Sequence, residues 1–262
     1  MAEHVDNLVL GRGKLYFERF PVGAKVGSGG ERYLGSTPEL SVTQSETTLD
    51  HRSMEGGRSV KDRSVALTND TSGSFTTDDI SRENVALWYL GEHSSVVVTA
   101  ATGMTSTYEG VKRGTFFQLG RSVASPAGAR NVSNVVVRKG AATVTMAGNY
   151  EVDEALGRVY ILPDAAGIAE DDDLSFTFDE AGGTQDRIIP NGQQIHGALR
   201  FIADNAEGDN DDRYYPYVKL APDGDHSLKG DDWQTMGFTY EVLKLNESTP
   251  AVIITRRPAT GG

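Results

Sequence analysis

Residues 37–77 read TPELSVTQSETTLDHRSMEGGRSVKDRSVALTNDTSGSFTT, and this stretch organises the chain. Two segments rich in Thr, Ser and Val flank a Glu-Gly-Gly turn at residues 55–57, which predicts a long β-hairpin. Near its base, apolar and polar residues alternate as they do in a half-buried strand. We therefore expect four apolar side chains at the base to lie in the core of the protein: Leu40, Val42, Val65 and Leu67.

The outer half of this hairpin lacks an apolar face. Residues 43–48 read TQSETT and residues 58–64 read RSVKDRS, so neither side of the ribbon carries a continuous apolar row. A two-stranded hairpin without a core-facing side is marginal in water, and we expect a second copy or another chain to cover it. We predict that residues 43–64 make contacts between subunits, with a tip that includes Ser53, Met54, Glu55, Gly56, Gly57, Arg58, Val60 and Lys61.

Length and composition limit the class of protein. The chain has 262 residues, enough for one large all-β domain or two small ones, and its 30 Gly with many Thr, Ser and Val residues favour short strands and turns. It has no cysteine, which excludes disulfides and thiolate metal sites. The N-terminus lacks the pattern of a signal peptide, and no apolar stretch approaches the roughly 20 residues that span a bilayer. We therefore expect a soluble protein that is made in a cytoplasm and does not contact a membrane.

The negative charge is unevenly distributed. The net charge is −12, and residues 164–231 hold 16 acidic residues against 5 basic ones. Acidic residues keep a protein soluble, and an acidic surface also repels phosphate, whereas a protein that binds nucleic acid is usually basic. Basic patches interleaved with aromatic residues are absent from the sequence, which argues against DNA or RNA recognition.

Strands separated by turns are expected along the rest of the chain. One helix is predicted at about residues 80–90, capped by Thr77 or Asp79 and ended by Gly91. Hairpins are predicted at residues 132–147 and 149–162, and a long strand at 233–245. Because strands and helices do not alternate, we predict a mainly β fold, a β-sandwich or barrel-like core with one flanking helix and a long hairpin. We treat residues 1–262 as a single domain, with an insertion around residues 120–131 and a flexible C-terminal tail at residues 256–262.

Few residues suggest chemistry. Carboxylates in the acidic loops could supply oxygen ligands for calcium, but their spacing does not match an EF-hand; they are Asp204, Glu207, Asp209, Asp211 and Asp212. The histidines are scattered and form no zinc motif: His4, His51, His93, His196 and His226. A spatial Ser-His-Asp triad leaves no signature in sequence, yet no catalytic motif is present. We therefore expect a structural or binding protein without enzymatic activity, cofactor or metal.

Several segments together resemble a known family. In their order along the chain, these segments are similar to the major tail tube proteins of long-tailed bacteriophages. They are LGRGKLYFERF, the hairpin, TTDDI, a helix that ends in LG, NYEVDEALGRVYIL, HGALRFIADNAEG and YYPYVKLAPDGDHSLKGDDWQTMGFTYEVLKL. The resemblance covers residues 8–246 and departs from the family around Ser94 and at residues 120–130. Its motifs are patterns of order and not catalytic signatures.

The resemblance implies a structural virion protein. Six copies would form a ring, rings would stack into the tail tube, and the hairpin would reach the adjacent ring. The tube would conduct the viral genome into the host, and DNA would pass through its lumen without specific binding. Tail terminator, tape measure and distal tail proteins are the partners that the resemblance implies. The alternative from the acidic loops is a calcium-dependent β-sandwich module that binds carbohydrate or a cell surface.

Overall fold

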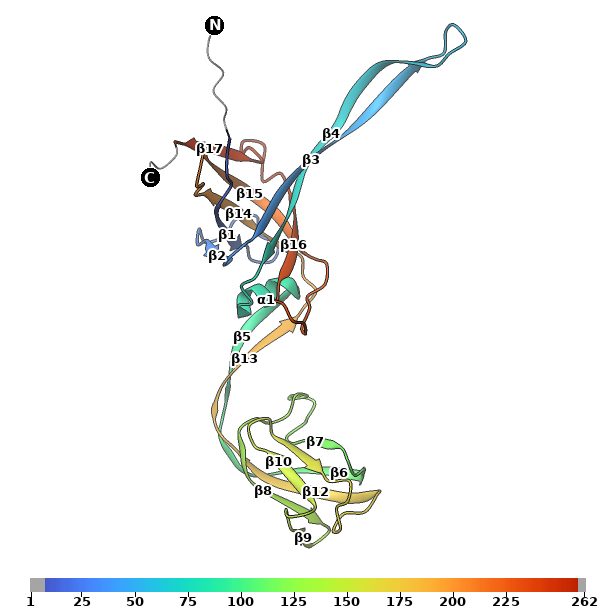
Figure 1. The fold of residues 1–262 in the computed structure, drawn as a ribbon, viewed down its shortest axis with the longest axis vertical. Helices are drawn as coiled ribbons and strands as arrows, with labels where there is room; N and C mark the ends of the chain where they lie inside the picture. The colour runs from blue at the N-terminus through green and yellow to red at the C-terminus, as the bar shows by residue number, and fades with distance from the viewer. Residues whose placement is uncertain (1–7, 259–262) are drawn as a thin grey trace. The chain divides into compact units, whose positions relative to one another are not determined.

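The chain forms antiparallel β-sheets and, within the described residues, one short helix. The computed structural model describes residues 8–258 (Figure 1). The mainly β fold with one flanking helix and a long hairpin is confirmed. Of the predicted C-terminal tail, Arg256 and Arg257 belong to strand β17 (Ile253–Arg257), because they pair with β15 (Asn210–Asp223), and residues 259–262 lie outside the described part.

The chain divides into two compact units, where we expected a single domain. Unit 1 comprises residues 1–93 and 188–262, and unit 2 comprises residues 94–187. The segment inserted into unit 1 is therefore much longer than the insertion expected around residues 120–131. Each unit has its own cluster of buried apolar side chains, which is why each is compact by itself. Strands β5 (Gly91–Val98) and β13 (Gly183–Pro190) pair and carry the chain from one unit to the other.

One large antiparallel sheet forms unit 1. Its order is β2-β1-β14-β15-β16-β4-β3, and β17 also pairs with β15. The strands in that order are Arg32–Tyr33, Gly13–Arg19, Ile195–Ala203, Asn210–Asp223, Met236–Val242, Val60–Thr77 and Glu39–Ser53. Because β15 lies in the middle of the sheet, its Pro216 could be accommodated only at a bulge, and the register with β14 does shift there, between Tyr215 and Val218.

Helix α1 (Arg82–Trp88) packs with the core of unit 1 and is shorter than predicted. Its N-cap is Ser81 and not Thr77 or Asp79, because Thr77 still belongs to β4 and its hydroxyl donates to the carbonyl oxygen of Leu34 at 3.0 Å. Gly91 does not end the helix either. Leu90 takes the left-handed conformation (φ 52°), and Gly91 begins β5 where a Cβ would lie 2.5 Å from the carbonyl oxygen of Ile189.

Unit 2 is a small β-sandwich. One sheet has the order β6-β12-β8-β9 (Ala101–Val111, Asp172–Glu180, Val132–Lys139, Ala142–Val144), and the other has the order β10-β11-β7 (Tyr150–Asp153, Arg158–Ile161, Phe116–Gln118). Both contribute to one buried cluster, which includes Phe176 and Val159. The hairpins predicted at residues 132–147 and 149–162 are confirmed as β8–β9 and β10–β11, while β6 was not expected.

Candidate assembly interface

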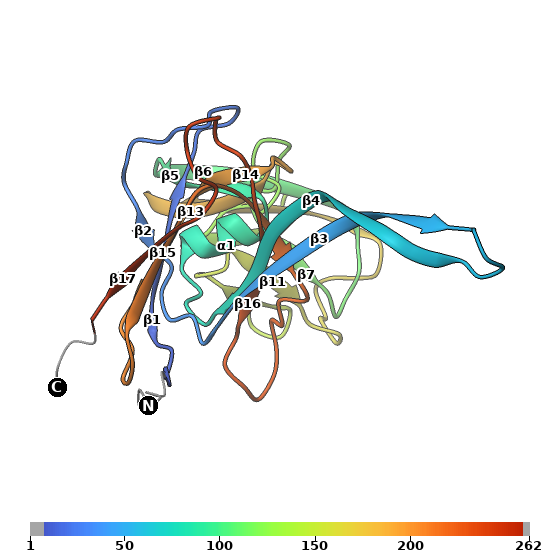
Figure 2. The ribbon, with the colours of Figure 1, turned by 90° about the horizontal axis from the view of Figure 1, so that it is seen from above.

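The long hairpin leaves the sheet of unit 1 as a free ribbon, which we call the arm (residues 43–71). Strand β16 pairs with β4 only from Ser72 to Thr77, so the rest of β4 pairs with β3 alone. Strand β3 is the last strand of the sheet, and its outer edge is unpaired within the described residues. Figure 2 shows β3 and β4 continuing beyond the other strands of this sheet. Both edges of the arm therefore present free backbone groups, which are able to pair with another chain.

The described side chains of unit 1 do not cover the arm. Every residue from Thr43 to Asp70 is exposed except Ser53, which is half-buried. Leu40 and Val42, at the base, are half-buried against the core of unit 1, as predicted. The predicted core positions of Val65 and Leu67 are wrong, because these side chains are 58% and 59% exposed.

Strand register explains this error. Leu40 pairs with Phe75, whereas Val65 pairs with Leu49, halfway along the arm. From the turn outwards the two strands stay in register apart from two bulges, so the partner of a base residue must lie nearly as far from the turn as Leu40 does. Val65 is too close to the turn to reach the base. The arm thus carries more apolar surface than its sequence pattern suggested, at Leu49, Met54, Val60, Val65 and Leu67.

Cross-strand polar pairs hold the two strands of the arm together. Asp50 lies 2.6 Å from the ammonium of Lys61 and accepts a hydrogen bond from Ser64 at 2.8 Å. The bond from Lys61, followed by that from Ser64, lowers the pKa of Asp50. His51 Nδ1 lies 2.6 Å from Asp62. Exposed pairs of this kind contribute little stability each, so they fix the register of the ribbon without replacing a core.

Two bulges and a glycine turn shape the arm. The register shifts between Thr47 and Thr48 and again between His51 and Arg52, which places an extra β4 residue at each point. Bulges strengthen the twist of a ribbon and hinder simple edge-to-edge pairing. At the tip, Gly56 and Gly57 have φ of 90° and 79°, a conformation that favours glycine.

All the predicted contact residues meet at this tip. Ser53 ends β3, Val60 begins β4, and the loop between them holds the others, namely Met54, Glu55, Gly56, Gly57 and Arg58, with Lys61 following on β4. Their role in subunit contacts remains a prediction. Sequence patterns did not indicate a second exposed apolar site in unit 1, formed by Leu228 and Trp233 in the loop between β15 and β16. Trp233 was expected to start a strand, but β16 begins at Met236.

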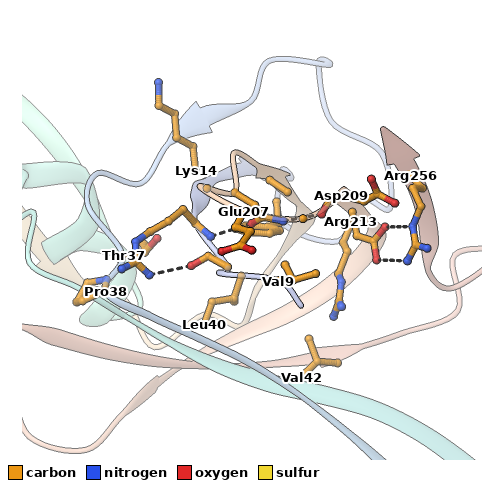
Figure 3. Close-up of a pocket in the computed structure, with 18 of the residues that line it drawn as sticks. Val9, Lys14, Thr37, Pro38, Leu40, Val42, Glu207, Asp209, Arg213 and Arg256 are labelled. Atoms are coloured by element: carbon orange, nitrogen blue, oxygen red, sulfur yellow. Dashed lines mark hydrogen bonds and ion pairs between the residues drawn. The ribbon is translucent and has the colours of Figure 1, made fainter. Parts of the chain in front are cut away.

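A groove of about 1480 Å³ lies beside the base of the arm. Figure 3 shows Leu40 and Val42 on one side of it and Arg256 on another. Its wall also includes residues 8–14, residues 36–38 and the loop that follows β14. That loop is tied to the N-terminal segment, because Leu10 donates to the Glu207 carbonyl oxygen at 3.0 Å and the Arg12 amide donates to Asn205 at 2.9 Å.

The carboxylates considered for calcium do not converge on one point. Asp211 accepts two bonds from Arg256, at 2.8 and 3.0 Å, and Asp212 accepts two from Arg257, at 2.6 and 2.8 Å. These bonds lower the pKa of both carboxyl groups. Across residues 8–258, no three His, Cys, Asp or Glu side chains are grouped so that they could hold a metal ion. Two of the five carboxylates considered for calcium, Asp211 and Asp212, are thus paired with arginine side chains of β17.

The histidines and the acidic stretch are dispersed in the fold as well. His4 lies outside the described residues, and the other four lie on separate elements. Residues 164–187 of the acidic stretch belong to unit 2, and the remainder belongs to unit 1. In unit 2, Asp171 and Asp172 pair with Lys112 and Lys139 at 2.6 and 2.7 Å. The acidic stretch is thus divided between the two units.

The fold and the arm define a mainly β protein with two compact units and an exposed two-stranded ribbon. The chain belongs to the family described as protein of unknown function UCP028589, whose model matches residues 8–248. No curated protein matches the sequence. Between residues 8 and 258, no helix is both long and apolar enough to cross a membrane.

Proposed function

We propose that this protein is a structural subunit that assembles with its own copies through the arm, and that the assembly is the tail tube of a long-tailed bacteriophage. The observation that carries the proposal is the arm itself. Its strands extend past the sheet, almost every residue on it is exposed, and both of its edges are free. An isolated two-stranded ribbon is marginally stable in water, so a neighbouring chain is the simplest source of the missing contacts.

The form of the assembly follows from the symmetry of such a contact. The arm of one copy meets a different surface on the next, and a head-to-tail contact of this kind either closes into a ring or continues as an open filament. In a stack of rings, contacts within a ring close, and contacts between rings continue as an open filament. The resemblance to tail tube proteins adds six copies per ring, a lumen through which DNA passes without specific binding, and tail terminator, tape measure and distal tail proteins as partners. In this proposal the protein is made in the host cytoplasm, acts in the virion and has no enzymatic activity.

Removal of the arm tests the proposal. Gln44 and Thr71 are directly paired, so residues 45–70 can be replaced by an Asn-Gly turn without disturbing the sheet. We expect the full-length protein to form rings or tubes as its concentration rises, and the shortened variant to stay monomeric with an unchanged melting temperature. Sedimentation velocity and negative-stain electron microscopy measure both. The matched control is Val123→Asp, on a fully exposed side chain of unit 2, which should assemble normally.

Two results would contradict the proposal. One is a wild-type protein that remains a monomer at high concentration. The other is an arm-deleted variant that assembles as well as the wild type, because the arm would then have no part in the contact.

A further inference from the structure

The loop between β15 and β16 (residues 224–235) displays two large apolar side chains. Leu228 is 67% exposed and Trp233 is 89% exposed. Hydrogen bonds organise the loop around them: Gln234 Nε2 donates to the Leu228 carbonyl oxygen at 3.2 Å, and the Trp233 amide donates to Asp232 at 2.7 Å. Trp is enriched among the residues that contribute most of the binding energy of an interface.

The loop contacts helix α1 through the ring of His226. The His226 ring packs edge-on against the Trp88 ring, with 5.6 Å between centroids. This contact holds the loop beside the C-terminal end of the helix while Leu228 and Trp233 remain outside. The exposed pair therefore has a fixed place on unit 1.

This loop and the tip of the arm lie at opposite ends of the same sheet. Strand β4 runs from the tip, at Val60, to Thr77, and Thr77 pairs with Met236, the residue that follows the loop. Figure 1 shows the arm leaving one end of the sheet and the loop lying at the other end, beside α1. A second copy that is displaced along the direction of β4 would bring its arm tip to this loop, and the same displacement repeats without limit.

The two ends carry complementary charges. Residues 52–63 of the arm contain four basic residues and two acidic ones, a net charge of +2, namely Arg52, Arg58, Lys61 and Arg63 against Glu55 and Asp62. Residues 223–233 contain four acidic residues and one basic one, a net charge of −3, namely Asp223, Asp225, Asp231 and Asp232 against Lys229. Opposite charges across an interface favour the correct partner and its register.

We propose that the β15–β16 loop is the acceptor for the arm tip of a second copy of this chain. Trp233 and Leu228 pack against Met54 and Val60 of the incoming tip, and the carboxylates of the loop face Arg58. This inference rests on the proposed function, because it names the surface that the arm contacts.

Cysteine crosslinking locates the contact directly, since the natural chain has no cysteine. Ser59→Cys places a thiol at the tip. Gly230→Cys places one in the loop, where a Cβ would meet no atom closer than 4.0 Å. Under mild oxidation, a mixture of the two variants should give a disulfide-linked dimer. The matched control mixture, Ser59→Cys with Val123→Cys, should give little, because Val123 is equally accessible but belongs to unit 2.

Charge exchange tests the specificity of the contact. We expect Arg58→Glu and Asp231→Lys, each alone, to raise the concentration needed for assembly by about tenfold, and the double variant to recover most of this loss. Trp233→Ala should raise it by at least about tenfold without changing the melting temperature, because the side chain is exposed. Asp164→Lys, an equally exposed reversal in unit 2, should have no effect.

The outcomes separate this inference from the proposed function. If the arm deletion abolishes assembly but Trp233→Ala and Asp231→Lys assemble normally and no crosslink forms, the acceptor lies elsewhere and the proposal of this loop is overturned. If the wild-type protein does not assemble, the proposed function itself fails.

Discussion

At the scale of single residues, the base of the arm is tightly packed around Gly73. A Cβ on Gly73 would lie 2.2 Å from the carbonyl oxygen of Ser41 and 2.5 Å from the Tyr240 ring. The Tyr240 hydroxyl donates to the same carbonyl oxygen at 3.1 Å, and burial raises the pKa of this phenol. The arm therefore starts where two strands and one buried tyrosine leave no room for a side chain.

Gly73→Ala should consequently destabilise unit 1. We expect a loss of about 2 kcal/mol in the free energy of unfolding, because overpacking against backbone cannot be relieved by a side-chain rotation. Urea titration measures the loss. Gly183→Ala is the control, since a Cβ there meets no atom within 4 Å. Equal stability of the two variants would show that the base of the arm is loosely packed.

His226 is a second informative residue. Neither of its ring nitrogens, nor Trp88 Nε1 beside it, makes a hydrogen bond within the described part of the chain, although all three atoms are buried. Unsatisfied buried polar groups are costly, so His226→Phe should raise the free energy of unfolding by about 1 kcal/mol while keeping the ring contact. Thermal melts compare the stability of this variant with that of His196→Phe, which replaces a histidine stacked on Tyr217. If His226→Phe were less stable than the wild type, the unpaired ring nitrogens of His226 would not be a net cost to the fold.

At the scale of secondary-structure elements, β17 is held to the sheet by charge as well as by backbone pairing. Arg257 binds Asp212 and also donates to the Ala203 carbonyl oxygen at 2.7 Å, while Asp212 accepts from the Ala203 amide at 2.9 Å. Three strands, β14, β15 and β17, thus meet at one carboxylate. The hydrogen bond from Arg257 is the largest cause of the lowered pKa of Asp212.

This arrangement predicts a pH dependence. A carboxyl group whose pKa is lower in the folded state stabilises the fold above its unfolded pKa of about 3.9, and this stabilisation is lost as the pH falls through the folded pKa. Asp212→Asn should therefore be less stable than the wild type at pH 7, by about 1 kcal/mol or less for such a partly exposed pair. In denaturant titrations the difference should shrink as the pH falls below about 3.9 and disappear once the pH lies below the folded pKa of Asp212. Asp70→Asn on the arm should show no difference, and a gap for Asp212→Asn that persists at low pH would rule out the ion pair as its cause.

The sequence predicts elements well where pairing is local. The hairpins β8–β9 and β10–β11 have short turns and alternating side chains, so both were found. Prediction failed where the partner lies far along the chain. The buried partner of Leu40 is Phe75, which no local pattern identifies, and the short helix has Ser81 as its N-cap because Thr77 is needed in β4. Trp233 was missed as an exposed residue because it was assigned to β16, although the alternation from Met236 onwards continues back through Gln234 and not through Trp233.

At the scale of the whole molecule, the main feature is the separation of the two cores. The buried cluster around Phe176 belongs entirely to unit 2, and that around Phe238 belongs entirely to unit 1. A single-domain interpretation could not anticipate this, because strand patterns do not reveal which strands share a core. The position of the hairpin tip, in contrast, could be predicted from the turn residues, while its role in subunit contacts stays a prediction.

Separate cores predict separate unfolding. Phe176→Ala should destabilise unit 2 by about 3–5 kcal/mol, the usual cost of removing a buried aromatic ring, and leave unit 1 unchanged. Phe238→Ala is the matched variant for unit 1. Calorimetry of the full chain should show that each variant lowers a different transition. If either variant lowered both transitions together, the units would form one cooperative domain.

The paired strands β5 and β13 have one more consequence. They bring the two ends of unit 2 together, and the Ser95 hydroxyl donates to the Asp186 carboxylate at 2.7 Å across this junction. Adjacent ends are what permits a domain to be exchanged within a chain. An unrelated domain with neighbouring termini could therefore be spliced between residues 93 and 188, and an assembly of such chains would carry one copy per subunit at regular intervals, as a display scaffold.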